Sequence, residues 1–296
     1  MENSDTKHLI PRRRFIGSLA MATAAGVFLN SCSAPKWKIG IYTRPWNKLD
    51  YKQALDNIAK AGFQYVGMMS HKGGRVISQE TSPEEAAAIY AEAQMRGLEI
   101  ASISGYSYNK KISPDDNIAA LKRLIDNSRI CKCPNLMMNG VSDLAIEADY
   151  YKAIAASCDY AESKGVELTL KPHGGTNATG AQCRAHIKSV GHKNFNLWYD
   201  PGNIYYFSDG AIDPVADCAD VDGLVTGMCV KDFKMPKDVN VTPGTGLVDF
   251  PGLLKRLRQG GFREGSLIIE CLDNVDGSQL ISEAIQARKM LEELVA

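Results

Sequence analysis

Short apolar runs alternate with longer amphipathic segments along most of the chain, at a spacing of roughly thirty residues. The runs are rich in Val, Ile, Leu and aromatic residues and have the length of buried β-strands. Eight such runs predict strands at 39–43, 65–70, 98–104, 135–139, 167–172, 195–200, 224–232 and 267–270. The segments between them have helical periodicity and predict helices at 50–61, 83–96, 114–129, 147–164, 178–190, 214–219, 250–259 and 277–294.

The boundaries of several predicted helices carry capping residues. Ser82 and Ser113 are each followed by Pro and then by two acidic residues, which is the pattern of a capped helix N-terminus. Glycines follow four helices at positions suited to a left-handed cap, namely Gly62, Gly97, Gly165 and Gly261. These local patterns support the predicted alternation of strands and helices.

Eight strands alternating with eight helices favour an α/β fold of the (β/α)8 barrel type. The competing fold is a doubly wound open sheet, which usually has a glycine-rich phosphate turn after its first strand. Here the first strand is followed by Arg44-Pro45-Trp46-Asn47, which contains no glycine. We therefore predict a single-domain TIM barrel over residues 38–296.

The first 32 residues predict an export signal rather than part of the fold. Arg12-Arg13-Arg14-Phe15 resembles a twin-arginine signal, and the mildly apolar stretch after it ends in Leu29-Asn30-Ser31-Cys32. That ending resembles a lipobox, in which Cys32 becomes the acylated N-terminus. The alternatives are an uncleaved membrane anchor and an ordinary amphipathic helix. We expect a signal over 1–32, a short linker over 33–37, and an exported protein that is periplasmic or a membrane-anchored lipoprotein.

Composition and charge narrow the classes of function. Apolar residues make up 45% and charged residues 23%, as in ordinary globular proteins, which excludes a disordered chain. Lys plus Arg and Asp plus Glu both number 34, so the chain lacks the basic excess of a nucleic-acid binder. No apolar run of about 18 residues follows the signal, so the membrane contact we expect is the N-terminal lipid anchor. Of eight cysteines one is Cys32, and the odd number left predicts no disulfide framework.

Ionisable residues stand at the ends of the last four predicted strands, where a TIM barrel builds its active site. Neighbouring strands lie about 4.8 Å apart, so residues at their ends can reach one ligand. Two carboxylates this close repel each other unless a cation or a shared proton lies between them. In strand order, the residues at these ends are Lys171 and His173, Asp200 and Asn203, Lys231, and Glu270.

Six motifs in the second half of the chain carry a resemblance to a known family. They are Lys171–Gly175, Tyr199–Asn203, Asp213-Pro214, Val230–Asp232, Gly244–Phe250 and Leu267–Glu270. Together they resemble the sugar phosphate isomerase/epimerase family, the xylose isomerase-like barrels that also include endonuclease IV. The order and spacing cover nearly the whole chain from Lys38. The set is specific for the superfamily, but not for one substrate.

The resemblance implies a divalent metal (Mn, Co, Zn or Mg), which the family holds with Glu, Asp, His and Glu at strands five to eight. Asp200 and Glu270 match this pattern, whereas Lys171 replaces the first Glu and Cys229 replaces the His. Because a protonated lysine repels a cation by several kcal/mol in a dry site, Lys171 can instead take the place of the metal. His173 matches a His that often follows the first Glu. We expect Asp200, Glu270 and His173 as ligands; Cys229 is a doubtful one, since a buried thiol is often inert.

These groups suit the removal of a proton next to a carbonyl, which leaves an enediolate that needs a base, an acid and positive charge. With a metal, the cation polarises the carbonyl and Glu270 moves the proton. Without one, Lys171 and Lys231 supply the charge, and Asp200 or Glu270 is the base. The same groups serve β-elimination, so a lyase stays an alternative, as does a non-catalytic sugar-binding lipoprotein. Nuclease-like hydrolysis is disfavoured because it needs more His and acidic ligands.

We therefore predict a sugar isomerase or epimerase, assisted by a divalent metal, with a small carbohydrate as its substrate and no nucleic-acid partner. Export favours an unphosphorylated sugar or keto-glycoside, because sugar phosphates rarely leave the cytoplasm. The predicted catalytic residues are Glu270, Lys171 and Lys231. The predicted substrate-binding residues are His173, His71, Trp46 and Asn203. Of these, His71 lies in a predicted loop at the rim, and the ring of Trp46 can stack on a sugar face. The stretch 243–249 is either a lid over the site or a plain loop.

Overall fold

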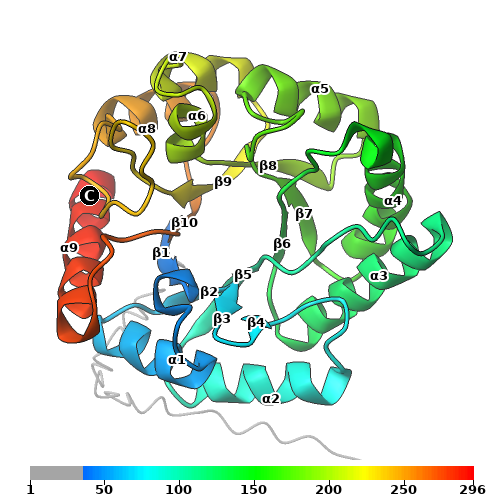
Figure 1. Ribbon diagram of the computed structural model, residues 1–296, viewed down its shortest axis with the longest axis horizontal. Coiled ribbons are helices and arrows are strands. Elements are labelled where there is room, and N and C mark those ends of the chain that lie inside the picture. Colours follow the sequence, from blue (N-terminus) through cyan, green and yellow to red (C-terminus); the bar gives the residue numbers. More distant parts are fainter. Residues whose placement is uncertain (1–35) are drawn as a thin grey trace, which may run out of the picture. The chain divides into compact units, whose positions relative to one another are not determined.

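The computed structural model describes residues 36–296, in which eight parallel strands close into a barrel ringed by helices (Figure 1). The hydrogen-bonded order around the barrel is β1-β10-β9-β8-β7-β6-β5-β2, so the first and last strands are neighbours. The predicted (β/α)8 fold is confirmed, and each predicted strand overlaps one barrel strand. The predicted export signal and the predicted lipidation of Cys32 lie outside the described residues. The barrel strands are β1 (Trp37–Tyr42), β2 (Tyr65–Met68), β5 (Glu99–Ile103), β6 (Asn135–Met138), β7 (Glu167–Leu170), β8 (Phe195–Tyr199), β9 (Val225–Val230) and β10 (Gly265–Ile269).

The helices between the strands begin at the capping residues that the sequence indicated. Ser82 and Ser113 accept hydrogen bonds from Glu85 N and Asp116 N at 3.2 and 3.1 Å. No helix within residues 36–296 is long and apolar enough to cross a membrane. The predicted helices are α1 (Tyr51–Lys60), α2 (Pro83–Gln94), α3 (Pro114–Ile130), α4 (Leu144–Ser163), α5 (Gly180–Val190), α7 (Pro214–Asp217), α8 (Phe250–Gln259) and α9 (Gly277–Val295).

Several short elements were not predicted. A hairpin of β3 (Ser70–His71) and β4 (Gly74–Arg75) follows β2, and the 3-10 helices η1 (Arg44–Trp46) and η2 (Cys218–Val221) lie in other connections. The helix α6 (Pro201–Phe207) follows β8 directly. It was missed because it is too short to show helical periodicity and begins with Pro-Gly, which also signals a turn. α6 matters most for function, because its N-terminal cap is a strand-end residue.

Buried apolar side chains form two clusters, one between the strands and the helices and one inside the barrel. Strand side chains that point outward pack with the helices in one large cluster. A second cluster, to which most of the strands contribute, contains Tyr42, Tyr65, Met69, Ala101, Met137, Trp198, Cys229 and Ile268. Gly67 and Gly227 leave room for the rings of Tyr42 and Trp198, which a Cβ at either glycine would overlap. The interior is therefore filled, and the charged residues gather above it, where the strands end.

Candidate functional site

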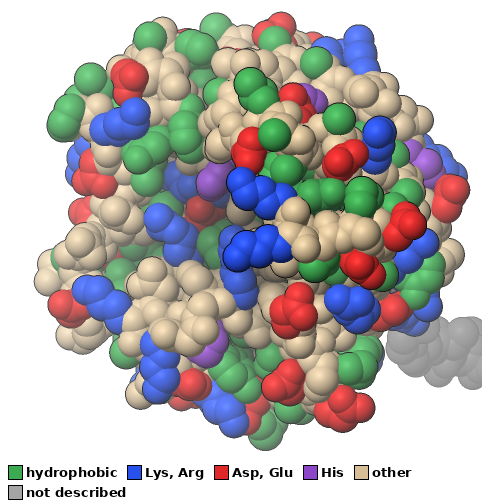
Figure 2. All heavy atoms as spheres, turned by 45° about the vertical axis from the view of Figure 1, so that its right-hand side comes forward, with side chains coloured by type: hydrophobic (Ala, Val, Ile, Leu, Met, Phe, Trp, Pro, Cys, Tyr) green, Lys and Arg blue, Asp and Glu red, His purple; other side chains and the backbone are tan. Residues whose placement is uncertain are grey.

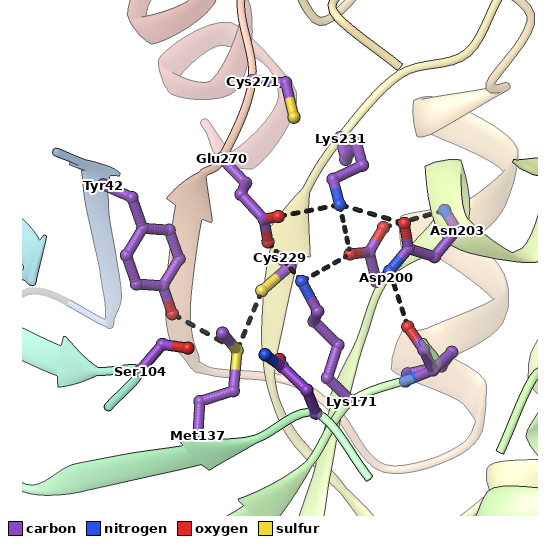
Figure 3. A network of polar contacts seen from close by, with 12 residues as sticks. Tyr42, Ser104, Met137, Lys171, Asp200, Asn203, Cys229, Lys231, Glu270 and Cys271 are labelled. Atoms are coloured by element: carbon purple, nitrogen blue, oxygen red, sulfur yellow. Dashed lines mark hydrogen bonds and ion pairs between the residues drawn. The ribbon is translucent and has the colours of Figure 1, made fainter. Parts of the chain in front are cut away.

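Four charged side chains meet at the carboxyl ends of β7 to β10 (Figure 3). Lys171, Asp200, Lys231 and Glu270 are each the first residue after one of these strands. The four strands are consecutive neighbours in the closed barrel, so their ends carry the side chains to one place. None of the four residues is more than 4% exposed. We refer to them as the quartet.

Each ammonium group of the quartet contacts both carboxylates. Lys171 Nζ lies 2.5 Å from Glu270 Oε2 and 3.3 Å from Asp200 Oδ2. Lys231 Nζ lies 2.8 Å from Glu270 Oε1 and 3.1 Å from Asp200 Oδ2. Positive and negative groups therefore alternate around a closed ring of four contacts. Buried charges of this kind are tolerated only when they are paired in this way.

The charges of the quartet hold Glu270 and Lys231 ionised. Burial alone would raise the pKa of Glu270, but the positive charges of Lys171, Lys231 and Arg44 outweigh it and hold that pKa well below its usual value. Burial likewise opposes the charge of Lys231, but Asp200 and Glu270 raise its pKa above the usual value. At neutral pH Glu270 is therefore a carboxylate and Lys231 an ammonium.

The helix α6 holds two members of the quartet, Asp200 and Lys231, in position. Asp200 Oδ1 caps this helix by accepting a hydrogen bond from Asn203 N at 2.9 Å, which leaves Oδ2 facing the lysines. Asn203 Oδ1 accepts a hydrogen bond from Lys231 Nζ at 3.0 Å, and its Nδ2 donates to the carbonyl of Pro172 at 2.7 Å. The sequence predicted Asn203 as a substrate-binding residue. In the structure its side chain is engaged with the protein and positions Lys231.

Arg44 is a residue of the site to which the sequence analysis gave no role. Its Nε lies 4.0 Å from Glu270 Oε1, and its Nη1 donates to Cys271 Sγ at 2.6 Å. The closed barrel places β1 beside β10 and so brings Arg44, just after β1, next to Glu270. In the sequence, this role of Arg44 was indicated by its position just after the first predicted strand. Around Glu270 there are thus three positive groups.

Beneath the quartet lie two sulfur-containing side chains, Cys229 and Met137, and the aromatic ring of Tyr42. Cys229 is fully buried, and its Sγ donates to Met137 Sδ at 3.2 Å (Figure 3). Tyr42 OH contacts the same sulfur at 3.4 Å and donates to Ser102 Oγ at 2.9 Å. Burial raises the pKa of the Cys229 thiol well above its usual value, so the thiol stays protonated. This favours the interpretation of Cys229 as an inert buried thiol.

The three remaining predicted substrate-binding residues have different surroundings. His173 is exposed at the rim, yet the surrounding protein and the charges of Lys171 and Lys231 lower its pKa to about 3, so the ring is neutral. His71 lies on β3 and packs edge-on against Tyr51, with ring centroids 5.8 Å apart. Trp46 is 3% exposed and belongs to the hydrophobic core. The charges of the quartet thus act on His173.

Asp232 organises the loop after β9, a role that the sequence analysis missed. Its two carboxylate oxygens accept hydrogen bonds from the backbone N–H groups of Phe233, Gly244, Gly246 and Val248 at 2.8 to 3.0 Å. These bonds tie the stretch 243–249 to the end of β9. They favour a plain, anchored loop over a lid. In the sequence, this role was indicated by an acidic residue, Asp232, at a strand end and by the glycine-containing stretch 243–249 that follows it.

Comparison with known proteins identifies the family. The family model described as xylose isomerase-like TIM barrel matches residues 55–294. The chain belongs to this family. No curated protein matches its sequence significantly.

Solved structures of similar fold include several sugar epimerases. A D-psicose 3-epimerase has a TM-score of 0.68 at 16% identity, over 87% of this chain and 99% of that one. An L-ribulose 3-epimerase has a TM-score of 0.66 at 18% identity, over 87% and 94%. A xylose isomerase domain protein from Planctomyces limnophilus has a TM-score of 0.67 at 19% identity, over 88% and 98%. At these identities the likeness concerns the fold.

The residues of this xylose isomerase-like barrel fit a divalent metal poorly. Ligand atoms of Asp200, Cys229 and Glu270 lie within 4.8 Å of one another, which is close enough for a shared ion. The carboxylate oxygens of this group, however, already contact two ammonium groups, which have no lone pair to offer and repel a cation. The thiol is protonated, and His173 is not a member of the group. The predicted metal remains a prediction that this donor set does not favour.

Proposed function

We propose that the protein is a sugar isomerase or epimerase that removes a proton next to the carbonyl group of an unphosphorylated sugar or keto-glycoside. The observation that carries this proposal is the ionised carboxylate of Glu270, held between the ammonium groups of Lys171 and Lys231. A carboxylate can accept the proton, and positive groups beside it stabilise the enediolate that forms. The family and the sugar epimerases of similar fold support the same class of substrate.

The test is proton exchange in D2O, followed by proton NMR, with D-fructose, D-psicose and D-tagatose and with D-fructose 6-phosphate. We expect deuterium to enter the position beside the carbonyl of a free sugar, and a second sugar to appear. Glu264→Gln, a change at an exposed residue before β10, is the matched control and should retain the parent rate.

Each other outcome of this assay contradicts part of the proposal. Turnover of the phosphorylated sugar alone would contradict the unphosphorylated substrate. Loss of a substituent from the sugar would indicate a lyase. Saturable binding without exchange would indicate a sugar-binding protein.

We further propose that residues 1–32 export the protein and that Cys32 carries a lipid anchor. The support is the sequence pattern Arg12-Arg13-Arg14-Phe15 and the lipobox-like Leu29–Cys32. Labelled palmitate should enter the parent chain in the native host and should not enter Cys32→Ala, which should leave the membrane fraction. Equal labelling of both chains, or of neither, would contradict the anchor.

A further inference from the structure

We infer that the ammonium groups of Lys171 and Lys231 take both the place and the task of a divalent cation at this site, so that the protein works without a metal. The inference rests on the proposed function for the reaction it describes, whereas its statement about metal binding stands on the quartet alone. Its basis is the position, the immobility and the charge of the two lysines.

The two nitrogen atoms occupy the space between the carboxylates. Lys171 Nζ bridges Glu270 Oε2 and Asp200 Oδ2, and Lys231 Nζ bridges Glu270 Oε1 and the same Asp200 oxygen (Figure 3). Both oxygens of Glu270 and the inward oxygen of Asp200 are thus in contact with a positive group. A cation that approached these oxygens would have to displace an ammonium.

The lysines are held in place by the surrounding fold. Lys171 is 1% exposed, and its backbone is fixed on both sides: its backbone N–H donates to the carbonyl of Met138 at 2.9 Å, and its backbone carbonyl accepts from Asn177 Nδ2 at 2.7 Å. The Lys231 stem packs so closely on α6 that a Cβ at Gly202 would lie 2.6 Å from its Cγ. Because both side chains are buried, moving either one away from the carboxylates would require the surrounding residues to shift.

The charge around the site also disfavours a cation. The quartet is neutral, and Arg44 beside Glu270 makes the surroundings positive. In Figure 2, Lys and Arg side chains surround the hollow at the open end of the barrel. A surplus of positive charge repels a divalent ion and stabilises negative charge that develops on a substrate oxygen.

The lysines retain hydrogen-bonding capacity for a substrate. An ammonium has three N–H donors. Within residues 36–296, the aligned hydrogen bond of Lys171 Nζ goes to Glu270 and that of Lys231 Nζ goes to Asn203. Asp200 Oδ2 contacts both ammoniums but has no aligned hydrogen bond in the described part of the chain. Lys171 Nζ contacts two oxygens and so has a third donor for a carbonyl oxygen placed above the quartet. Lys231 Nζ contacts three oxygens, and the donor that faces Asp200 Oδ2 without an aligned bond is the one that can turn to the same carbonyl oxygen.

The reaction then balances without a further reactant. Glu270 accepts the proton from the carbon next to the carbonyl, and the electron pair of that C–H bond forms the C=C bond of an enediolate. The carbonyl π electrons move to oxygen, where the ammonium groups of Lys171 and Lys231 donate hydrogen bonds to the new negative charge. For isomerisation, Glu270 returns the proton to the former carbonyl carbon, while the proton of the neighbouring hydroxyl group passes to the oxyanion, so the carbonyl moves by one carbon with no change of oxidation state overall. For epimerisation, solvent water delivers a proton to the opposite face of the first carbon, and Glu270 releases its own proton to solvent.

The test is metal binding, measured separately from activity. The full chain, purified without chelators, should contain less than about 0.1 equivalent of Mn, Co, Zn or Mg, and Mn²⁺ should leave its melting temperature unchanged. Lys171→Glu replaces a cation by a carboxylate at the same strand end and should bind Mn²⁺ at least about tenfold more tightly than the parent by calorimetry. Lys188→Glu, an exposed change on α5, is the matched control and should show no gain.

One equivalent of metal in the parent, lost in Asp200→Asn, would overturn the inference. That measurement needs no folded lysine variant, so it decides the matter even where Lys171→Glu fails to fold. Failure of the proposed function would appear instead as absence of sugar exchange, whatever the metal content. An active parent that loses its exchange activity in EDTA would also overturn the inference, whereas exchange unaffected by EDTA supports it.

Discussion

Glu270→Gln should lower the rate of sugar proton exchange by about 1000-fold or more, because an amide cannot accept the proton that the carboxylate removes. The change is nearly isosteric, so the barrel should remain folded. It should nevertheless reduce the free energy of unfolding by about 3–5 kcal/mol, since Lys171 and Lys231 then share one buried carboxylate. Exchange is measured by proton NMR in D2O and stability by urea denaturation. Glu264→Gln should change neither quantity.

The same variant tests the ionisation of Glu270. Because its pKa in the folded protein lies below the value in the unfolded chain, its contribution to stability is present above the unfolded pKa of about 4.3. That contribution is lost as the pH falls below this value toward the folded pKa. The parent should therefore lose more stability than Glu270→Gln between pH 6 and the acid range. Parallel stability curves for the two proteins would show that Glu270 is not held ionised by the lysines.

Lys231→Met should lower the exchange rate by about 100-fold or more, since a positioned donor to a developing oxyanion contributes about that much. It should also cost about 3–5 kcal/mol of stability, because a buried charge loses its partner and Asn203 Oδ1 loses its donor. Exchange by NMR and urea denaturation measure the two effects. Lys255→Met, an exposed change on α8, is the matched control and should leave both unchanged.

The pH profile separates a catalytic Lys231 from a merely structural one. Loss of its positive charge should raise the pKa of Glu270. In Lys231→Met, the acid limb of the pH–rate profile, where the exchange rate falls as Glu270 is protonated, should therefore move to higher pH. Lys231→Arg keeps the charge and should keep the limb near its parent position even at a reduced rate. An unchanged acid limb in Lys231→Met would show that Lys231 does not act on Glu270.

Patterns along the chain are enough to predict the barrel and the rim on which the site lies. Strand and helix periods, the capping serines Ser82 and Ser113, and the glycines at helix ends are local signals, and they need no knowledge of distant contacts. Because parallel strands of one barrel end on the same side, the residues after strands five to eight had to share one rim. For the same reason, the order of residues along the chain is enough to group Lys171, Asp200, Lys231 and Glu270 at one site.

The contacts among these four residues follow from the folded barrel and cannot be read from the sequence. Spacing along the chain says nothing of which carboxylate oxygen faces which ammonium, and here each lysine contacts both acids. Closure of the barrel brought Arg44 beside Glu270 from the far end of the chain. The short helix α6, invisible to periodicity, turned Asn203 toward Lys231. A charged group takes its role from neighbours that the fold assembles, and that assembly makes the quartet a ring of ion pairs rather than a set of metal ligands.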